Sequence, residues 1–108
     1  MKRGDVFIAA TGSGFGGKPR PVVIIQGDAY ANAPVVMVAP LTDEKHDIEL
    51  IRPLVIADPS NGLRKSSVIA TDTLIAVRRH QFGRLVGALS NEDCARMDTA
   101  LRLILGLA

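Results

Sequence analysis

The segment TGSGFGGKPRPVVIIQ (residues 11–26) decides which kind of fold this chain adopts. It fits two phosphate-binding patterns, G-x-x-x-x-G-K ending at Lys18 and G-x-G-x-x-G ending at Gly17. Both patterns require a helix that begins at the loop and aims its N–H groups at the phosphate. Here Lys18 is followed by Pro19, which has neither a hydroxyl nor an N–H, and soon afterwards by four β-branched residues, VVII, which favour a strand. The segment is therefore a glycine-rich loop leading into a strand, and both motif matches are accidental.

Short apolar segments separated by turn residues predict strands along most of the chain. We expect strands at residues 5–10, 21–26, 35–41, 47–57 with an interruption at Pro53, 67–77 and 83–89. Pro40 indicates that the third of these strands ends or bulges there. Strands in series with short turns predict a mainly β fold, a small barrel of antiparallel strands.

The pattern changes to that of a helix after residue 89. Ser90 and Asp93 form a variant of the capping box, with acidic residues in the first turn. Apolar side chains then recur at helical spacing, at Cys94, Met97, Leu101, Ile104, Leu105 and Ala108. We expect one amphipathic C-terminal helix of roughly four turns, packed over the sheet.

The composition is that of a single globular domain spanning residues 1–108. Apolar residues make up 47% of the chain and charged residues 22%, as in ordinary soluble proteins. The single cysteine, Cys94, excludes an internal disulfide and a cluster of metal-binding thiolates, which fits a reducing, cytoplasmic location. We find neither a signal peptide nor the run of roughly 20 apolar residues that a membrane helix needs.

The net charge of +2 is too small to indicate nucleic-acid binding by itself. The basic residues mostly flank apolar segments, at Lys18, Arg20, Arg52, Arg64, Lys65, Arg78, Arg79 and Arg84. At strand ends and in loops they could form one phosphate-attracting face, or they could be scattered over a solvated surface. Charge alone leaves both interpretations open.

Arg20 is the basic residue with the most constrained backbone. Pro19 and Pro21 each fix φ near −65° and favour an extended conformation for the residue before them. Arg20 is therefore presented from a stiff backbone at the start of a strand. It is either a preorganised cation for a phosphate or one partner of a surface salt bridge.

Five stretches of the sequence resemble the MazF/PemK toxins of bacterial toxin–antitoxin systems. In order they are KRGDVFIA (2–9), KPRPVVIIQ (18–26), VAPLT (38–42), NGLRKSSVIATD (61–72) and GRLVGALS (83–90). With the final helix, the resemblance covers essentially the whole chain. It implies an SH3-like barrel, a homodimer and a ribonuclease that cuts single-stranded RNA, often mRNA, at short sequences without a metal or other cofactor. It also implies a MazE-like or PemI-like antitoxin whose disordered tail occupies the RNA groove.

By the same resemblance, Arg20 and Thr42 are the residues tied most firmly to catalysis, and Asp72 matches an acidic residue implicated in some members. Metal-free cleavage needs an acceptor for the 2′-OH proton, a group that stabilises the phosphorane and a proton donor for the leaving 5′-oxygen. Arg20 could stabilise the phosphorane, and Thr42 could donate a hydrogen bond to the same phosphate. Asp72 is the candidate acceptor of the 2′-OH proton. The products would be a 2′,3′-cyclic phosphate and a 5′-OH. Taken alone, Asp72 could instead order nearby turns, and Thr42 could satisfy turn backbone.

Single-stranded RNA is usually held by cations and by aromatic side chains that stack on bases. Phe15, in the glycine-rich loop, is the candidate for stacking. Lys18, Arg64 and Lys65 are the candidate phosphate contacts.

The proton donor has no clear candidate. Ala70 stands where some family members carry an arginine, and the glycine-rich loop lacks the histidine found in others. Histidine titrates near neutral pH, so acid–base catalysis by His46 and His80 is an alternative.

The sequence also bears on two functions other than RNA cleavage. The related gyrase-poisoning toxins share the fold without ribonuclease activity, so a non-catalytic toxin or an RNA- or protein-binding module stays open as an alternative. An adaptor for proline-rich peptides is disfavoured, because the chain has only three Phe, one Tyr and no Trp.

Overall fold

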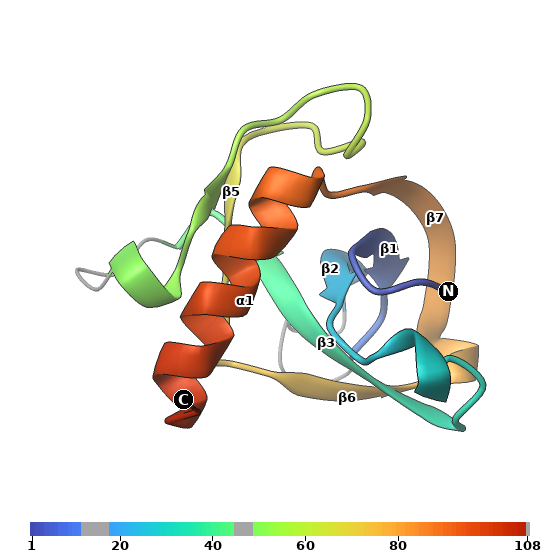
Figure 1. Cartoon of the computed structure of the whole chain (residues 1–108). Coiled ribbons are helices and arrows are strands. Elements are labelled where there is room, and N and C mark those ends of the chain that lie inside the picture. The colour runs from blue at the N-terminus through green and yellow to red at the C-terminus, as the bar shows by residue number, and fades with distance from the viewer. Residues whose placement is uncertain (12–17, 45–48, 108) are drawn as a thin grey trace.

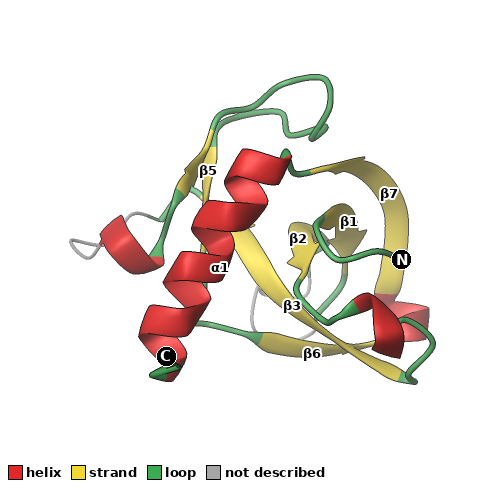
Figure 2. Ribbon diagram, viewed as in Figure 1, coloured by secondary structure: helices red, strands yellow, loops and turns green. Residues whose placement is uncertain are grey.

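Seven strands and one long helix account for most of the computed structural model, which describes residues 1–11, 18–44 and 49–107 (Figures 1 and 2). The strands are β1 (Asp5–Ala9), β2 (Arg20–Ile24), β3 (Val35–Thr42), β4 (Leu54–Val55), β5 (Ser67–Ile69), β6 (Ile75–Arg78) and β7 (Phe82–Ala88). The helices are α1 (Asn91–Leu105) and the short 3-10 helices η2 (Asp28–Tyr30), η3 (Glu49–Ile51) and η4 (Arg79–Gln81). These elements confirm the predicted mainly β fold with a C-terminal helix.

The strands pair in the order β4-β5-β3-β2-β1-β7, and β6 also pairs with β3. Every pair is antiparallel, as predicted. β3 is the central strand, since it pairs with β2 along one edge and with β5 and β6 in turn along the other. Figure 1 shows α1 crossing in front of β3 while β7 curves away to one side. The sheet is thus wrapped into a half-barrel with α1 against it.

The register of β2 on β3 determines which residues meet at their ends. Val22 lies opposite Pro40. Two residues further along each strand, the same register places Arg20 opposite Thr42. Arg20 is the first residue of β2 and Thr42 the last residue of β3. Residues directly opposite each other in an antiparallel pair lie on the same face of the sheet. The backbone pairing therefore brings together two residues that are far apart in the sequence.

Two predicted strands are shorter than expected. The strand expected at residues 67–77 is divided into β5 and β6, because the two parts pair with β3 in different registers. Ile69 lies opposite Leu41 and Ile75 opposite Val38, so six residues of this segment span only three residues of β3. The surplus residues form a turn between β5 and β6.

The strand expected at residues 47–57 consists only of β4, and η3 precedes it in the described part of the chain. Pro53 separates the two elements, and its carbonyl accepts a 3.0 Å hydrogen bond from the Ile69 N–H. Pro40 ends no strand, contrary to the prediction; β3 continues to Thr42, and Pro40 lies where β3 passes from β6 to β5.

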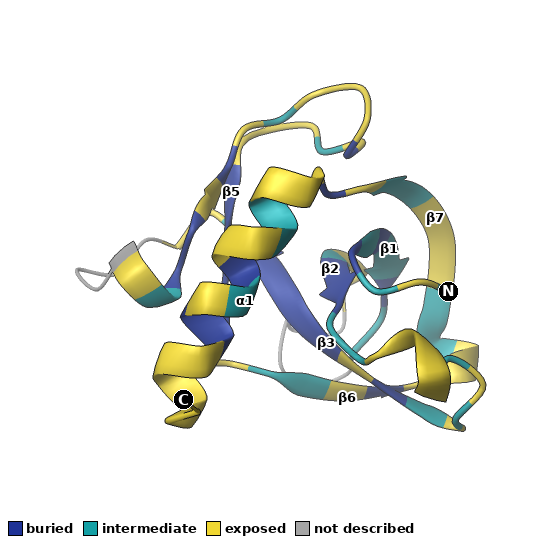
Figure 3. Cartoon of the chain, in the orientation of Figure 1, coloured by how far each residue is buried: buried dark blue, intermediate teal, exposed yellow. Residues whose placement is uncertain are grey.

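Two apolar clusters form the core, one on each face of β2. The cluster between the sheet and α1 contains Val6, Val23, Ala39, Leu41, Val55, Ile69, Leu89, Met97 and Leu101. The second contains Ala9, Val22, Ile24, Val36, Val38 and Val77. Phe7 and Phe82 pack against this cluster, and their two rings meet edge to face with the centroids 5.6 Å apart. Figure 3 shows that β2 and the part of β3 next to α1 are buried, whereas the outer side of α1 is largely exposed. The β-branched run of β2 fills both clusters because successive side chains of a strand point to opposite faces.

The start of α1 agrees with the predicted helix. The Ser90 hydroxyl accepts a 3.0 Å hydrogen bond from the Asp93 N–H, so the predicted cap is confirmed. Gly106 ends the helix in the left-handed conformation. Within the described ranges, no helix is long and apolar enough to cross a membrane.

Gly62 and Gly106 allow a matched test of the contact between the 58–66 loop and β7. Both have positive φ, +72° and +70°, but a Cβ on Gly62 would lie 2.0 Å from the Val86 carbonyl oxygen, whereas a Cβ on Gly106 would have nothing within 4 Å. A left-handed alanine costs about 1–2 kcal/mol and a steric clash about 1–3 kcal/mol more. We therefore expect Gly62→Ala to lower the free energy of unfolding by about 3 kcal/mol and Gly106→Ala by about 1 kcal/mol, measured by urea denaturation. Equal losses would contradict the close approach of this loop to β7.

Candidate active site

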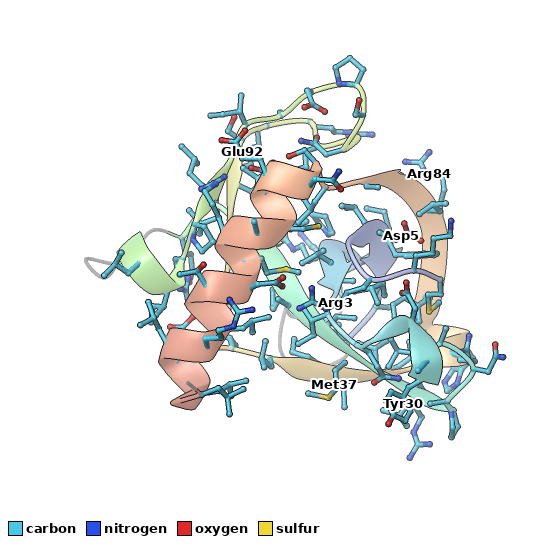
Figure 4. All side chains as sticks on the ribbon, viewed as in Figure 1. Arg3, Asp5, Tyr30, Met37, Arg84 and Glu92 are labelled. Atoms are coloured by element: carbon cyan, nitrogen blue, oxygen red, sulfur yellow. The ribbon has the colours of Figure 1, made fainter. Side chains whose placement is uncertain are left out.

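A cleft of about 710 Å³ opens at the ends of β2 and β3, between β7 and the 58–66 loop. Its charged lining residues are the cations Arg20, Arg52, Arg64, Lys65 and Arg84 and the carboxylates Asp43 and Glu44. Apolar walls are supplied by residues such as Ile8, Leu63 and Val86. Five of the eight basic residues that flank apolar segments thus line one cleft, and their charge attracts an anionic ligand. Figure 4 shows one of them, Arg84, projecting outward from β7.

Arg20 and Thr42 both line this cleft, as their opposed positions on β2 and β3 require. Arg20 is exposed, and its backbone is held by the flanking prolines at the start of β2. The Thr42 hydroxyl oxygen accepts a 3.2 Å hydrogen bond from the Glu44 N–H. A hydroxyl accepts through its lone pairs and donates through its hydrogen, so Thr42 keeps a hydrogen for a ligand. Together the two residues offer a guanidinium and a hydroxyl donor to the same anion.

Asp43 places a negative charge beside these donors. The Lys65 ammonium donates a 2.7 Å hydrogen bond to its carboxylate, and both side chains are exposed. This hydrogen bond and the charge of Lys65 lower the pKa of Asp43 from its usual value, and the charge of Arg20 lowers it further. Asp43 is therefore ionised at neutral pH and partly neutralises Lys65. Exposed ion pairs of this kind are weak, so an anionic ligand can replace the carboxylate.

Asp72 lies in the turn between β5 and β6 and is linked to the cleft through another residue. Its carboxylate accepts a 2.9 Å bond from the Nε–H of Arg52. The Arg52 side chain is 7% exposed and lines the cleft, whereas the Asp72 side chain is 24% exposed. Among the described residues, the wall includes Ala70 and Thr73 on either side of Asp72 but not Asp72 itself. Of the three predicted catalytic residues, two share the cleft and the third is bonded to Arg52 in its wall.

The predicted RNA contacts are divided between cleft and surface. Arg64 and Lys65 line the cleft, in the loop that leads into β5. Lys18 is exposed and is not among the described lining residues. Phe15 lies outside the described residues.

The two histidines also differ in position. His46 lies outside the described residues. His80 is exposed in η4 and is absent from the described wall of the cleft. In the parts of the chain that the structure describes, no three His, Cys, Asp or Glu side chains gather where they could hold a metal ion.

Arg52 and Arg84 are cleft residues that the sequence analysis did not assign to the site. Each is a single charged residue within an otherwise apolar stretch, in LIRPLVI and FGRLVGA. For Arg52, which is buried, the isolated charge is the available signal, because charged side chains are seldom buried without a partner. Only the fold shows that both face the same cleft.

The sequence and the fold were compared with those of known proteins. Residues 2–105 match the family described as "PemK-like, MazF-like toxin of type II toxin-antitoxin system". A similar protein, "Probable endoribonuclease MazF" of Mycolicibacterium smegmatis, is 38% identical over 108 residues, covering 100% of this chain and 99% of the relative. The structure of "Mycobacterium tuberculosis toxin MazF-mt6" superposes with a TM-score of 0.82 at 25% identity, covering 96% of this chain and 98% of that one. A structure described as "Endoribonuclease in complex with its cognate antitoxin from Mycobacterial species" has a TM-score of 0.78 at 22% identity and covers 100% and 97%.

The pairing of Asp43 with Lys65 can be tested by titration. Removing the ammonium in Lys65→Met takes away the largest causes that lower the pKa of Asp43, so we expect this pKa to rise toward its usual value near 3.8. The carboxyl carbon of Asp43, followed by NMR as a function of pH, measures the change. Lys18→Met is the control and should leave the pKa of Asp43 where it is. An unchanged pKa in Lys65→Met would contradict the ion pair.

Proposed function

Because this chain belongs to the family of PemK-like, MazF-like toxins of type II toxin–antitoxin systems, we propose that it is an endoribonuclease that cuts single-stranded RNA, including mRNA, at short specific sequences. Cleavage takes place in the cleft at the ends of β2 and β3. The observation that carries this proposal is the presence of Arg20 and Thr42 on opposed strand ends in one cationic cleft. The endoribonuclease named as a relative, 38% identical over the whole chain, supports it.

The reaction needs only groups of the RNA and the protein. The ribose 2′-oxygen attacks the adjacent phosphorus and the bond to the 5′-oxygen breaks, which leaves a 2′,3′-cyclic phosphate and a 5′-OH. The Arg20 guanidinium donates to two non-bridging oxygens and stabilises the charge of the phosphorane. The Thr42 hydroxyl donates a further bond to the same group. Since the guanidinium supplies the charge stabilisation, we propose a reaction that needs no metal.

Asp72 remains our candidate for the acceptor of the 2′-OH proton. A carboxylate has two oxygens with about four lone-pair sites, so the bond from Arg52 to one oxygen is compatible with further acceptance. Among the described residues, Ala70 and Thr73 line the cleft and Asp72 does not, so the attacking nucleotide must extend past these two residues to reach it. The donor of the proton to the leaving 5′-oxygen is a separate group.

Arg64, Lys65 and Lys18 are the proposed phosphate contacts along the strand, and Phe15 the proposed stacking residue. We propose Arg84 as a further phosphate contact, because it lines the same cleft as Arg64 and Lys65 and lies on β7.

We also propose that the chain works as a cytoplasmic homodimer of one toxin domain, residues 1–108, and is neutralised by a cognate antitoxin of the MazE or PemI type. Exposed apolar side chains near the end of α1, Leu103, Leu105 and Leu107, supply a surface that a second subunit can cover. The antitoxin complex of the structural neighbour supports a protein partner. A cationic cleft suits an acidic segment of such a partner as well as it suits RNA.

The role of Arg20 is tested by RNA cleavage in EDTA. Removal of one preorganised donor to a developing oxyanion costs about 3–4 kcal/mol of barrier, so Arg20→Ala should cleave roughly 100- to 1000-fold more slowly than the unchanged chain. Arg79→Ala is the matched control, since Arg79 donates to the Ala33 carbonyl outside the cleft. Mapped products should carry 5′-OH ends. Intact RNA after incubation with the folded unchanged chain would refute the enzyme and favour a non-catalytic binding module.

The role of Arg84 is tested by the salt dependence of binding. For single-stranded RNA the slope of log K against log salt concentration is about −0.7 for each phosphate contact. With an RNA whose 2′-OH groups are methylated, Arg84→Ala should make the slope shallower by about 0.7. Arg102→Ala, at the exposed end of α1, should leave it unchanged. A slope unaffected by Arg84→Ala would exclude a phosphate contact.

A further inference from the structure

Arg52 makes more hydrogen bonds within the cleft wall than a simple ion pair requires. Its side chain is 7% exposed, although arginine is seldom buried. The Nε–H donates to the Asp72 carboxylate at 2.9 Å, Nη1 to the Glu44 carbonyl at 2.9 Å and Nη2 to the Thr73 hydroxyl at 3.4 Å. One guanidinium thus joins the segment that follows β3 to the turn between β5 and β6.

The bond to Glu44 connects Arg52 with Thr42. The Glu44 carbonyl accepts from Arg52, and the Glu44 N–H donates to the Thr42 hydroxyl oxygen at 3.2 Å. Residue 44 lies beyond the end of β3, so no strand pairing holds it. Arg52 is the partner in the described structure that binds its carbonyl, and through this residue it is linked to the Thr42 hydroxyl.

The bonds to Asp72 and Thr73 connect Arg52 with the other side of the site. The turn that carries these residues exists because β5 and β6 pair with β3 in different registers. Its backbone is held by hydrogen bonds of its own, such as that from the Thr73 N–H to the Ala70 carbonyl at 3.1 Å, whereas the guanidinium binds its side chains. Of the three proposed catalytic residues, Asp72 is thus bonded to Arg52 directly and Thr42 is linked to it through Glu44.

We infer that Arg52 is a positioning residue, which orients the Thr42 hydroxyl and the Asp72 carboxylate relative to each other for the cleavage reaction. This inference rests on the proposed function, because the relative orientation of Thr42 and Asp72 matters for catalysis only if the chain cleaves RNA. The planar fork of arginine donates in several directions at once, whereas a lysine ammonium at the end of a flexible stem cannot hold the same three acceptors in one geometry. A positive charge at residue 52 is therefore not enough to hold these three acceptors, and the planar shape of the guanidinium is also needed.

The kinetic test compares Arg52→Lys and Arg52→Met with the unchanged chain on a single-stranded RNA. A misplacement of about 1 Å can cost on the order of 100-fold in rate, so we expect kcat to fall roughly 10- to 100-fold in both variants while KM changes little. Arg52→Lys keeps the charge and should fold even if Arg52→Met does not. Arg96→Met is the matched control, because Arg96 also pairs with a carboxylate, Asp93, and with a carbonyl, that of Leu54, away from the cleft. It should keep its kcat.

A second readout does not depend on catalysis. Side chains occupy staggered rotamers, and three-bond NMR couplings report whether χ1 of Thr42 is in one of them or averaged over several. We expect one rotamer in the unchanged chain and in Arg96→Met, and averaging in Arg52→Lys.

The outcomes separate the two claims. If the unchanged chain cuts no RNA but Thr42 loses its single rotamer in Arg52→Lys, the proposed function fails and the positioning by Arg52 stands as a structural property. If the unchanged chain is active and folded Arg52→Lys keeps both its kcat and the single Thr42 rotamer, the inference is overturned and the function stands. A fall in kcat accompanied by an equal rise in KM would also overturn it, because Arg52 would then act in binding RNA.

Discussion

The antiparallel pairing of β2 with β3 is the constraint on which the cleft depends. Its register is set by the β-branched residues of β2, whose alternate side chains must enter two different apolar clusters. A slip of one residue would exchange the two faces of the strand, move its side chains into the opposite clusters and turn Arg20 away from the face that carries Thr42. The register that satisfies the core also places Arg20 opposite Thr42 at the sheet edge. The position of the two polar residues is therefore a consequence of apolar packing.

Behind this edge the site is held by polar contacts. Arg52 is itself buried and links the end of β3 to the turn between β5 and β6. Asp43 and Lys65 are exposed at the front of the cleft, where their ion pair exchanges readily with solvent or ligand. The cleft thus combines a rigid inner wall with an adaptable outer rim. That combination suits an enzyme that must hold one phosphate firmly and accept a long flexible strand.

Local patterns in the sequence were sufficient for most of the fold. The Pro19-Arg20-Pro21 segment and the run after it predicted the start of β2, and Ser90 with Asp93 predicted the start of α1. The division of β5 from β6 could not be predicted, because it follows from two registers on β3 and leaves no local signal. The same limit applies to the site. Arg20 was recognisable from its flanking prolines and Thr42 only from the family resemblance, whereas the role of Arg52 depends on contacts with distant segments of the chain.

The most direct test of this account is a crystal structure of the chain with a single-stranded RNA whose attacking 2′-OH is methylated, so that it binds without being cut. The account requires the phosphate at the blocked position to lie within hydrogen-bond distance of both the Arg20 guanidinium and the Thr42 hydroxyl, with Arg52 still bonded to Glu44 and Asp72. An RNA bound outside the cleft, or a phosphate at that position that contacts neither residue, would contradict it.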